Sequence, residues 1–411
     1  MNKDFESKLD RYAELAVKVG VNLHKGQKLL ILAPIEAADF TRRIVKSAYR
    51  NGCSRVIVDW RDTPTSRIHI EEAPDETLQT LPRWEIDKFK SFVEDHDCLI
   101  SLTGNDPKAF EGVDPKRLMM LSKAQGEQLD FFQKAQLTGN IHWSIIGVPT
   151  AAWATAVFPD KSDDEAIAAL WEAIFAATRI DQDDPIYIWE SHDQMLKEKV
   201  EKLNTYHFKT LYYKSSKTDL SINLHPDHVW IGGSQCSTIG RSYISNMPTE
   251  EVFTAALKTG VNGTVVSTKP LSAMGQIIDN FSLTFKNGKV VDFQAEKGYE
   301  ALRQILEMDD GMKFIGEVAL VPYDSPISRS GITFMNTLFD ENASCHLALG
   351  AAYTMNIKNT EGLSKEVLNE KGVNQSNGHI DFMIGSQDLD IDGETAHGER
   401  IPVFRNGNWA I

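Results

Sequence analysis

The stretch KLLILAP at residues 28–34 is an apolar run of the length expected for a buried strand. A helical pattern follows over residues 37–51, and a second apolar run, RVIVDW, occupies residues 55–60. Strands that alternate with helices need crossover connections, and these connections produce a parallel sheet. The alternation continues with apolar runs at residues 97–102 and 142–148. The amino-terminal part is therefore predicted to be an α/β domain with a mostly parallel, open sheet.

The pattern changes after the polar segment DQDDP at residues 181–185. A helix predicted over residues 187–203 leads into a part with alternating apolar runs, such as residues 281–285 and 290–293. Asn287-Gly288 lies between these two runs, and Asn-Gly is typical of a type I′ hairpin turn. We therefore expect an α+β carboxy-terminal domain with largely antiparallel strands. The predicted domains are residues 1–185 and 186–411.

The composition is that of a folded, acidic protein. The chain has 411 residues, of which 42% are hydrophobic, and this length favours two domains over one. A formal net charge of −15 argues against binding to nucleic acid or to anionic membranes. Four scattered cysteines and a charged amino terminus favour a reducing, cytoplasmic location. No apolar run of about 18 residues is present, so we expect no membrane span.

Common catalytic and nucleotide-binding motifs are missing from the chain. No strand is followed by GxGxxG or GxxxxGK[ST], so there is no reason to propose a nucleotide site. HExxH and GxSxG are also missing, which disfavours the common zinc-protease and serine-hydrolase designs.

Histidines and carboxylates gather in two apolar segments of the second half. In GHIDFMIG, residues 378–385, His379 and Asp381 stand two apart in an expected strand, so their side chains point to one face. The upstream segment ENASCH adds Glu341 and His346. Imidazoles combined with carboxylates suit divalent first-row metals, and a metal-dependent hydrolase is therefore the leading hypothesis.

The apolar residues 347–353 after His346 are interpreted as the start of a helix. On a helix, His346 and Tyr353 would be seven residues apart and would share a face, so the phenol would lie near the partners of His346. Glu341 would then stand before that helix, where an anion is favourable even without a metal.

Three more glutamates precede or interrupt apolar runs. Taken alone, Glu250-Glu251 is most simply a solvated pair after a turn, although Glu251 leads directly into Val252-Phe253 and could be drawn inward. Glu317 lies within FIGEVALV, where a carboxylate needs either a basic side chain or a cation as its partner. Three further histidines lie in polar context and are expected at the surface: His225, His228 and His397.

Several segments, in order along the chain, carry a more specific signal: NMPTEEVFTA (246–255), GVNGT (260–264), GEVALV (316–321), ENASCH (341–346), HIDFMIG (379–385) and PVFRNGNW (402–409). Together they resemble the M29 family of metalloaminopeptidases, the group of aminopeptidases T and S. The resemblance implies a cytoplasmic homodimer that removes amino-terminal residues from peptides with two divalent metal ions. It also implies an α/β amino-terminal domain and a metal-bearing carboxy-terminal domain.

The family's metal-binding positions fall on Glu251, Glu317, Glu341, His346, His379 and Asp381, with Tyr353 as an additional active-site residue. Zinc, cobalt, manganese and magnesium all suit such a set of ligands. One departure stands at Ala256-Leu257, where the family usually has Pro-His, and we expect it to alter the local backbone or the substrate preference.

The resulting hypothesis is hydrolysis by a water molecule that two metals activate, with Glu317 or Asp381 shared between them. Tyr353 would donate a hydrogen bond to the oxyanion, and the general base is Glu250 or Glu317. Two alternatives stay open at this stage. The chain could be a metal-dependent amidase for a non-peptide substrate, or a binding protein that keeps the fold without catalysis.

Overall fold

The structure, a computed structural model, describes residues 3–273 and 276–411. The chain forms two compact units. The first contains Met1–Ser191 together with Ser234–Pro248, and the second contains His192–Gly233 together with Thr249–Ile411. The predicted domains are each continuous in sequence, whereas residues 234–248 of the structure return to the first unit.

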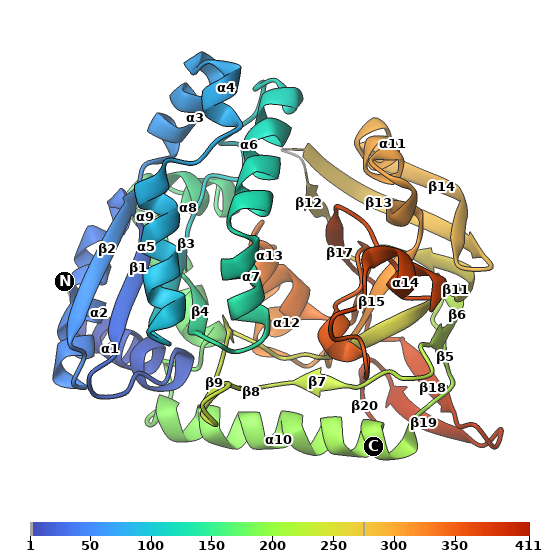
Figure 1. The fold of residues 1–411 in the computed structure, drawn as a ribbon. Helices are drawn as coiled ribbons and strands as arrows, with labels where there is room; N and C mark the ends of the chain where they lie inside the picture. The colour runs from blue at the N-terminus through green and yellow to red at the C-terminus, as the bar shows by residue number, and fades with distance from the viewer. Residues whose placement is uncertain (1–2, 274–275) are drawn as a thin grey trace. The chain divides into compact units, whose positions relative to one another are not determined.

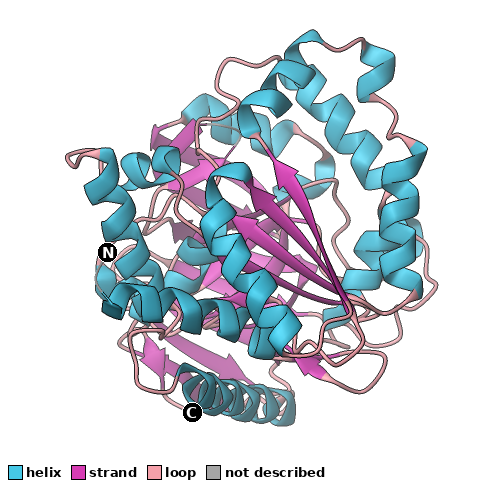
Figure 2. Ribbon diagram, turned by 90° about the vertical axis from the view of Figure 1, so that its left-hand side faces the viewer, coloured by secondary structure: helices cyan, strands magenta, loops and turns pink. Residues whose placement is uncertain are grey.

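The first unit is built on a five-stranded parallel sheet, as predicted (Figure 1). Its strand order is β10-β4-β3-β1-β2, and β10 comes from the returning segment. Apolar side chains of β1 and β3, such as Leu30 and Ile100, are fully buried, because helices cover the strands (Figure 2). The strands are β1 (Lys28–Pro34), β2 (Arg55–Arg61), β3 (Cys98–Thr103), β4 (His142–Gly147) and β10 (Asn246–Met247); β8 (Gln235–Cys236) and β9 (Ser242–Tyr243) pair separately.

The helices of this unit are α1 (Lys3–Leu15), which continues as a π-helical turn (Ala16–Gly20), α2 (Ala38–Arg50), α3 (Thr63–Glu72), α4 (Asp75–Leu78), α5 (Arg83–Glu94), α6 (Pro115–Gln128), α7 (Asp130–Leu137), α8 (Ala151–Val157) and α9 (Asp163–Ala177). The long helix α10 (Pro185–Tyr206) leads from the first unit into the second and confirms the helix predicted there. Within the described ranges, no helix is both long enough and apolar enough to cross a membrane.

The second unit contains a large sheet whose pairings are all antiparallel. Its main path is β17-β16-β15-β11-β6-β5-β18-β19-β20. The strands are β5 (Thr210–Lys214), β6 (Asp219–Leu224), β7 (Ile231–Gly232), β11 (Val252–Val266), β12 (Leu271–Ala273), β13 (Gln276–Lys286), β14 (Lys289–Lys297), β15 (Ile315–Leu320), β16 (His346–Gly350), β17 (His379–Met383), β18 (Asp390–Glu394), β19 (Arg400–Arg405) and β20 (Asn408–Trp409). Its helices are α11 (Tyr299–Glu307), α12 (Pro326–Ser330), α13 (Thr337–Asp340) and α14 (Lys365–Glu370).

The predicted hairpin is present between β13 and β14. Its turn residues Asn287 and Gly288 have φ values of 50° and 82°, which is the left-handed conformation that a type I′ turn requires. Gly288 also approaches the backbone of β11, because an added Cβ would lie 1.8 Å from the carbonyl oxygen of Lys258. Only glycine fits this position.

The helix predicted over residues 347–353 is wrong, because this segment contains most of strand β16. β16 lies between β15 and β17, so every residue from His346 to Gly350 is buried. A short run of buried apolar residues has no periodicity that separates a strand from a helix, and here pairing with two neighbouring strands decides the outcome.

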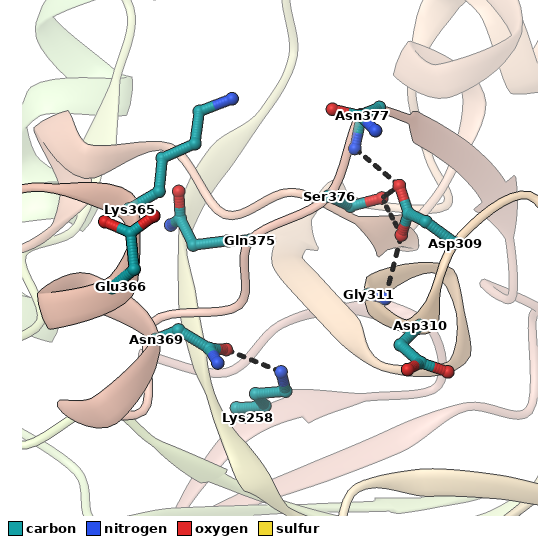
Figure 3. Close-up of a pocket in the computed structure, with 10 residues that line it drawn as sticks. All are labelled: Lys258, Asp309, Asp310, Gly311, Lys365, Glu366, Asn369, Gln375, Ser376 and Asn377. Carbon is teal, nitrogen blue, oxygen red and sulfur yellow. Dashed lines mark hydrogen bonds between the residues drawn. The ribbon is translucent and has the colours of Figure 1, made fainter.

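Asp309 stabilises the turn that leads into β17 by accepting hydrogen bonds from it (Figure 3). Its carboxylate accepts hydrogen bonds from the backbone N–H of Asn377 at 2.7 Å, from Ser376 Oγ at 2.8 Å and from the backbone N–H of Gly311 at 2.8 Å. Burial alone would raise the pKa of Asp309, but these hydrogen bonds hold it below its ordinary value. Asp309 therefore stabilises the folded chain in its ionised form.

We predict that Asp309→Asn lowers the free energy of unfolding at pH 7 by about 1–3 kcal/mol, because the variant loses charge-assisted hydrogen bonds. A depressed folded-state pKa contributes stability above the unfolded-state pKa of about 3.9, and this stability is lost as the pH falls through the folded-state value. The difference between wild type and variant should therefore shrink below about pH 4. Urea denaturation of wild type and variant between pH 7 and about pH 3 measures this difference in the free energy of unfolding.

Asp310→Asn is the matched control, because the adjacent Asp310 side chain is 94% exposed and forms an ion pair with Lys313 in the same turn. It should change stability by less than about 0.5 kcal/mol. Equal losses in the two variants would contradict the role given to Asp309.

Candidate metal centre

Four adjacent strands, β11, β15, β16 and β17, have two chemically different faces. Alternate residues pack into the apolar core: Val252, Val318, Leu320, Leu347, Leu349 and Phe382. The residues between them point to the opposite face, because side chains alternate along a strand. That face carries Glu317 of β15, His346 of β16, and His379 and Asp381 of β17, and Glu251 immediately precedes β11.

The strand register brings these residues together. Ala348 pairs with both Glu317 and Asp381, so the two carboxylates flank one alanine of the central strand. His346 pairs with Ala319, which lies two residues beyond Glu317 on the same face. Side chains from four segments of the chain therefore meet over one small area of the sheet.

Glu317 lies at the middle of the cluster. Nε2 of His346 is 3.7 Å from Glu317 Oε1 and 3.2 Å from Glu251 Oε2. Nε2 of His379 is 3.6 Å from Glu317 Oε2 and 3.3 Å from Asp381 Oδ1. Two groups of three ligand atoms result, Glu251–Glu317–His346 and Glu317–His379–Asp381, and the atoms within each group lie within 4.8 Å of one another. Both groups share Glu317.

The imidazoles are oriented by backbone carbonyls. Nδ1 of His379 lies 2.8 Å from the carbonyl oxygen of Ala351, and Nδ1 of His346 lies 3.3 Å from that of Ser344. A proton on Nδ1 would be held by these oxygens, which leaves Nε2 directed at the carboxylates. Ligating histidines are commonly fixed in this way.

The charges of the cluster are strongly coupled. Burial would lower the pKa of His379, but Asp381 and Glu317 beside it raise the pKa to about 9. For His346, burial is likewise outweighed by Glu251 and Glu317, which hold its pKa well above the ordinary value. The pKa of Glu317 is raised, mainly because this carboxyl is buried. Burial would also raise the pKa of Asp381, but His379 brings it below the ordinary value.

Glu341 and Tyr353 complete the set of predicted site residues. Glu341 lies in a 3-10 turn (Glu341–Ala343), and its pKa is raised well above the ordinary value by burial and then by the charges of Glu251 and Asp381. Tyr353 follows β16, with its ring centroid 4.5 Å from that of His379. Burial and then the nearby carboxylates raise the pKa of Tyr353, so the phenol keeps its proton.

The donor set fits divalent cations. Four carboxylates, Glu251, Glu317, Glu341 and Asp381, stand against two imidazoles, which is an excess of negative charge in a largely buried place. Glu317 Oε2 and Asp381 Oδ1 are buried and accept no well-formed hydrogen bond from the described residues, although both face the single nitrogen Nε2 of His379. Buried carboxylate oxygens are stable only with a partner, and oxygen and imidazole ligands suit first-row divalent metals.

Asn342 supports the cluster and was not found by sequence reasoning. Its side chain is fully buried. Oδ1 accepts a hydrogen bond from the backbone N–H of Glu250 at 2.7 Å, and Nδ2 donates to the carbonyl oxygen of Leu338 at 2.9 Å. One amide thereby ties the start of β11 to the turn that holds Glu341. The only sequence signal was its place directly after Glu341.

Glu250 differs from the solvated residue that the simplest interpretation predicts. It is 3% exposed, and its Oε2 lies 3.4 Å from Nε2 of His192. Glu250 is thus a buried residue paired with a histidine of α10, and it belongs to neither group of three ligand atoms.

The surface position predicted for His225 and His228 is wrong. Both are buried, and each has a backbone carbonyl as a partner: His225 Nε2 lies 3.0 Å from the oxygen of Lys371, and His228 Nδ1 lies 2.7 Å from the oxygen of His225. These partners are distant or irregular in sequence, so polar context alone could not reveal them. His397 is exposed, as expected.

A separate polar pocket of about 340 Å³ lies in the second unit (Figure 3). Lys258, Asp310, Glu366 and Asn377 are among its lining residues, and none of the predicted site residues lines it. Two pairs of its side chains bind each other: Lys258 Nζ donates a 2.6 Å hydrogen bond to Asn369 Oδ1, and Ser376 Oγ donates to Asp309. We assign it no chemistry.

The departure from the family pattern, Ala256-Leu257, lies in β11 itself. Ala256 is fully buried in the apolar core with Val252, and the pairing of β11 with β6 shifts in register after it. Leu257 follows it in the strand and lies close to Gly372, so the two changed residues do not share one face of β11.

Comparisons with known proteins agree with this geometry. The model of the M29 family of thermophilic metalloproteases matches residues 5–409. Aminopeptidase AmpS of Bacillus subtilis is 48% identical over 407 residues, and the match covers 99% of each chain. Aminopeptidase 2 of Geobacillus stearothermophilus is 49% identical, and the match covers 100% of this chain and 99% of that protein.

The same similarity extends to a solved structure. Wild-type AmpT from Thermus thermophilus matches with a TM-score of 0.92 and 39% identity, over 99% of this chain and 100% of that one. The family match and the structural match each extend over nearly the full length of the chain, so each of them includes both units. The chain therefore belongs to the M29 family of metalloproteases and is a peptidase.

Proposed function

We propose that this peptidase removes amino-terminal residues from peptides and that its cluster holds two divalent cations. The observation that carries the proposal is Glu317, which belongs to both groups of three ligand atoms. One cation would be held by Glu251, Glu317 and His346, and the other by Glu317, His379 and Asp381. Glu341 would contribute to the same centre, and the relatives named as aminopeptidases support the substrate class.

Zinc, cobalt, manganese and magnesium stay open as the native metal, because all of them accept carboxylate and imidazole ligands. When bound, such cations supply positive charge that acidifies water and polarises a scissile carbonyl group. The free amino group of a substrate would be a further ligand of this centre, which would restrict cleavage to the amino terminus.

Tyr353 can act on the developing oxyanion. Its phenol is protonated and lies beside His379, so it can donate a hydrogen bond where negative charge forms in the transition state. Of the two carboxylates considered as general base, Glu317 lies in the cluster, whereas Glu250 lies beside His192. This placement disfavours Glu250, whereas Glu317 would accept a proton from water only through an oxygen that no cation occupies.

Family membership and the complete ligand set disfavour a non-catalytic protein, and an amidase for a non-peptide substrate is the remaining alternative. Hydrolysis of aminoacyl-anilides and short peptides distinguishes the two. The homodimer and the cytoplasmic location implied by the family resemblance stay predictions.

Removal of divalent metals should abolish hydrolysis of a leucyl-anilide substrate, because four carboxylates without cations cannot polarise a carbonyl group. Activity should return on addition of zinc, cobalt, manganese or magnesium, and the best of these should also raise the melting temperature, since a cation that binds only the folded state stabilises it. Chelator titration followed by metal addition measures both effects. Undiminished turnover by verified metal-free protein would contradict the proposal.

Glu317→Gln should lower kcat/KM by roughly 10³-fold or more, because both ligand groups lose a negatively charged member. It should leave the fold intact, as circular dichroism can verify, and should reduce the metal content. Glu250→Gln is the matched control, being a buried glutamate outside both ligand groups. Loss of activity in Glu250→Gln together with full activity in Glu317→Gln would show that Glu250, and not Glu317, is the essential glutamate.

Tyr353→Phe should lower kcat by roughly 10²–10³-fold with little change in KM, because the lost hydrogen bond would form mainly in the transition state. The metal content should stay at the wild-type level. Tyr323→Phe, which changes an exposed tyrosine of the same unit, serves as the control. A Tyr353→Phe enzyme with wild-type kcat would remove the phenol from the mechanism.

A further inference from the structure

We propose that Phe253 lines the subsite for the side chain of the substrate's amino-terminal residue, and that this subsite prefers large apolar side chains. The inference rests on the proposed aminopeptidase function of the cluster. It adds a specificity that neither the family match nor the ligand set defines.

The strand pattern places Phe253 on the same face as the cluster. Its neighbour Val252 packs into the apolar core, so Phe253 points to the opposite side, as Glu251 does. Phe253 pairs with Ala319, and Ala319 in turn pairs with His346. Phe253, Ala319 and His346 therefore form one row across three strands.

Phe253 differs from the other non-ligand residues of this face next to the cluster. Ala319 and Ala348 are small and fully buried, and Met383, which pairs with His346, is larger and also buried. Phe253 is a bulky apolar side chain on this face that is only half-buried, so part of its ring is accessible to a ligand.

Aromatic rings continue from Phe253 toward the ligands. The ring centroids of Phe253 and Tyr353 are 6.4 Å apart at an interplanar angle of 76°, and those of Tyr353 and His379 are 4.5 Å apart. Edge-to-face pairs of this kind are stable arrangements for aromatic rings. Phe253 and Tyr353 thus provide an apolar wall beside a strongly charged centre.

The backbone of Phe253 is held rigidly. It pairs with Ile231 on one side and with Ala319 on the other, and its carbonyl oxygen accepts a hydrogen bond from Asn356 Nδ2 at 3.1 Å. A backbone fixed in this way loses little freedom when a ligand binds, which is a property of preorganised binding sites.

The covalent structure of the substrate determines which of its groups would contact Phe253 and Tyr353. The amino group and the scissile carbonyl of an amino-terminal residue are both attached to its Cα, so a centre that binds them also places the side chain within a few ångströms. Phe253 stands two residues from Glu251, on the face where these groups must lie. An apolar side chain at that Cα would exclude water from the ring and gain affinity.

The test compares kcat/KM for leucyl-, phenylalanyl- and alanyl-anilides in the metal-loaded enzyme. Phe253→Ala should lower the preference for leucine and phenylalanine over alanine by roughly 10-fold or more, because apolar pockets discriminate side chains on this scale. The loss of kcat/KM should be smaller for the alanyl substrate than for the leucyl and phenylalanyl substrates. Phe253→Thr, which suits a strand position, should give the same shift and provides a second variant if Phe253→Ala folds poorly.

Thermal shifts with free amino acids supply a readout that is independent of turnover. Phenylalanine should stabilise the metal-loaded wild type more than alanine does, and Phe253→Ala should lose this difference. Phe293→Ala is the matched control, since Phe293 of β14 is also half-buried and its ring centroid lies 4.9 Å from that of a tyrosine, Tyr299. It should keep the wild-type preference.

Unchanged side-chain preference in both Phe253 variants would overturn the inference while leaving the aminopeptidase function standing. The same holds for equal shifts in the Phe253 and Phe293 variants. A wild type that hydrolyses none of the anilides would instead contradict the proposed function itself.

Discussion

Repulsion among buried carboxylates is the constraint on which the centre depends. Glu251, Glu317 and Asp381 converge on one face of a sheet, Glu341 in a neighbouring turn adds a fourth carboxylate, and two imidazoles offset only part of the charge. Isolated groups of this kind would shift their pKa values or move toward solvent. The sheet prevents this movement, because each ligand-bearing strand is held by pairing with its neighbours and by an apolar opposite face. A site that is costly without cations is thereby preorganised to bind them.

The fold achieves this convergence through long-range pairing. Strands β11, β15, β16 and β17 lie far apart in sequence, yet they are consecutive neighbours in the sheet. Their common alternation sends apolar residues to the core and polar residues to the site. Asn342 and Asp309 act at the ends of these strands, where the chain turns and would otherwise be free to move. Ligand geometry and sheet stability are therefore closely linked in this unit.

Much of this arrangement could be predicted from the sequence, but only where local rules apply. The parallel sheet followed from strands alternating with helices, and the β13–β14 hairpin followed from Asn287-Gly288. The ligand positions were expected from motifs that resemble a family. Residues 347–353 were mistaken for a helix because a short buried run carries no decisive period. The pairing register between strands could not be predicted from the sequence, and this register places Phe253 and His346 opposite the same residue, Ala319.

The central claim is that Glu317 is shared by two cation sites, and crystals grown with zinc or manganese test it most directly. Anomalous diffraction data collected at the metal's absorption edge locate the ions without reference to activity. The account predicts two peaks, one bounded by Glu251, Glu317 and His346 and the other by Glu317, His379 and Asp381. The absence of peaks at this cluster in fully loaded protein, or ions that contact neither oxygen of Glu317, would contradict it.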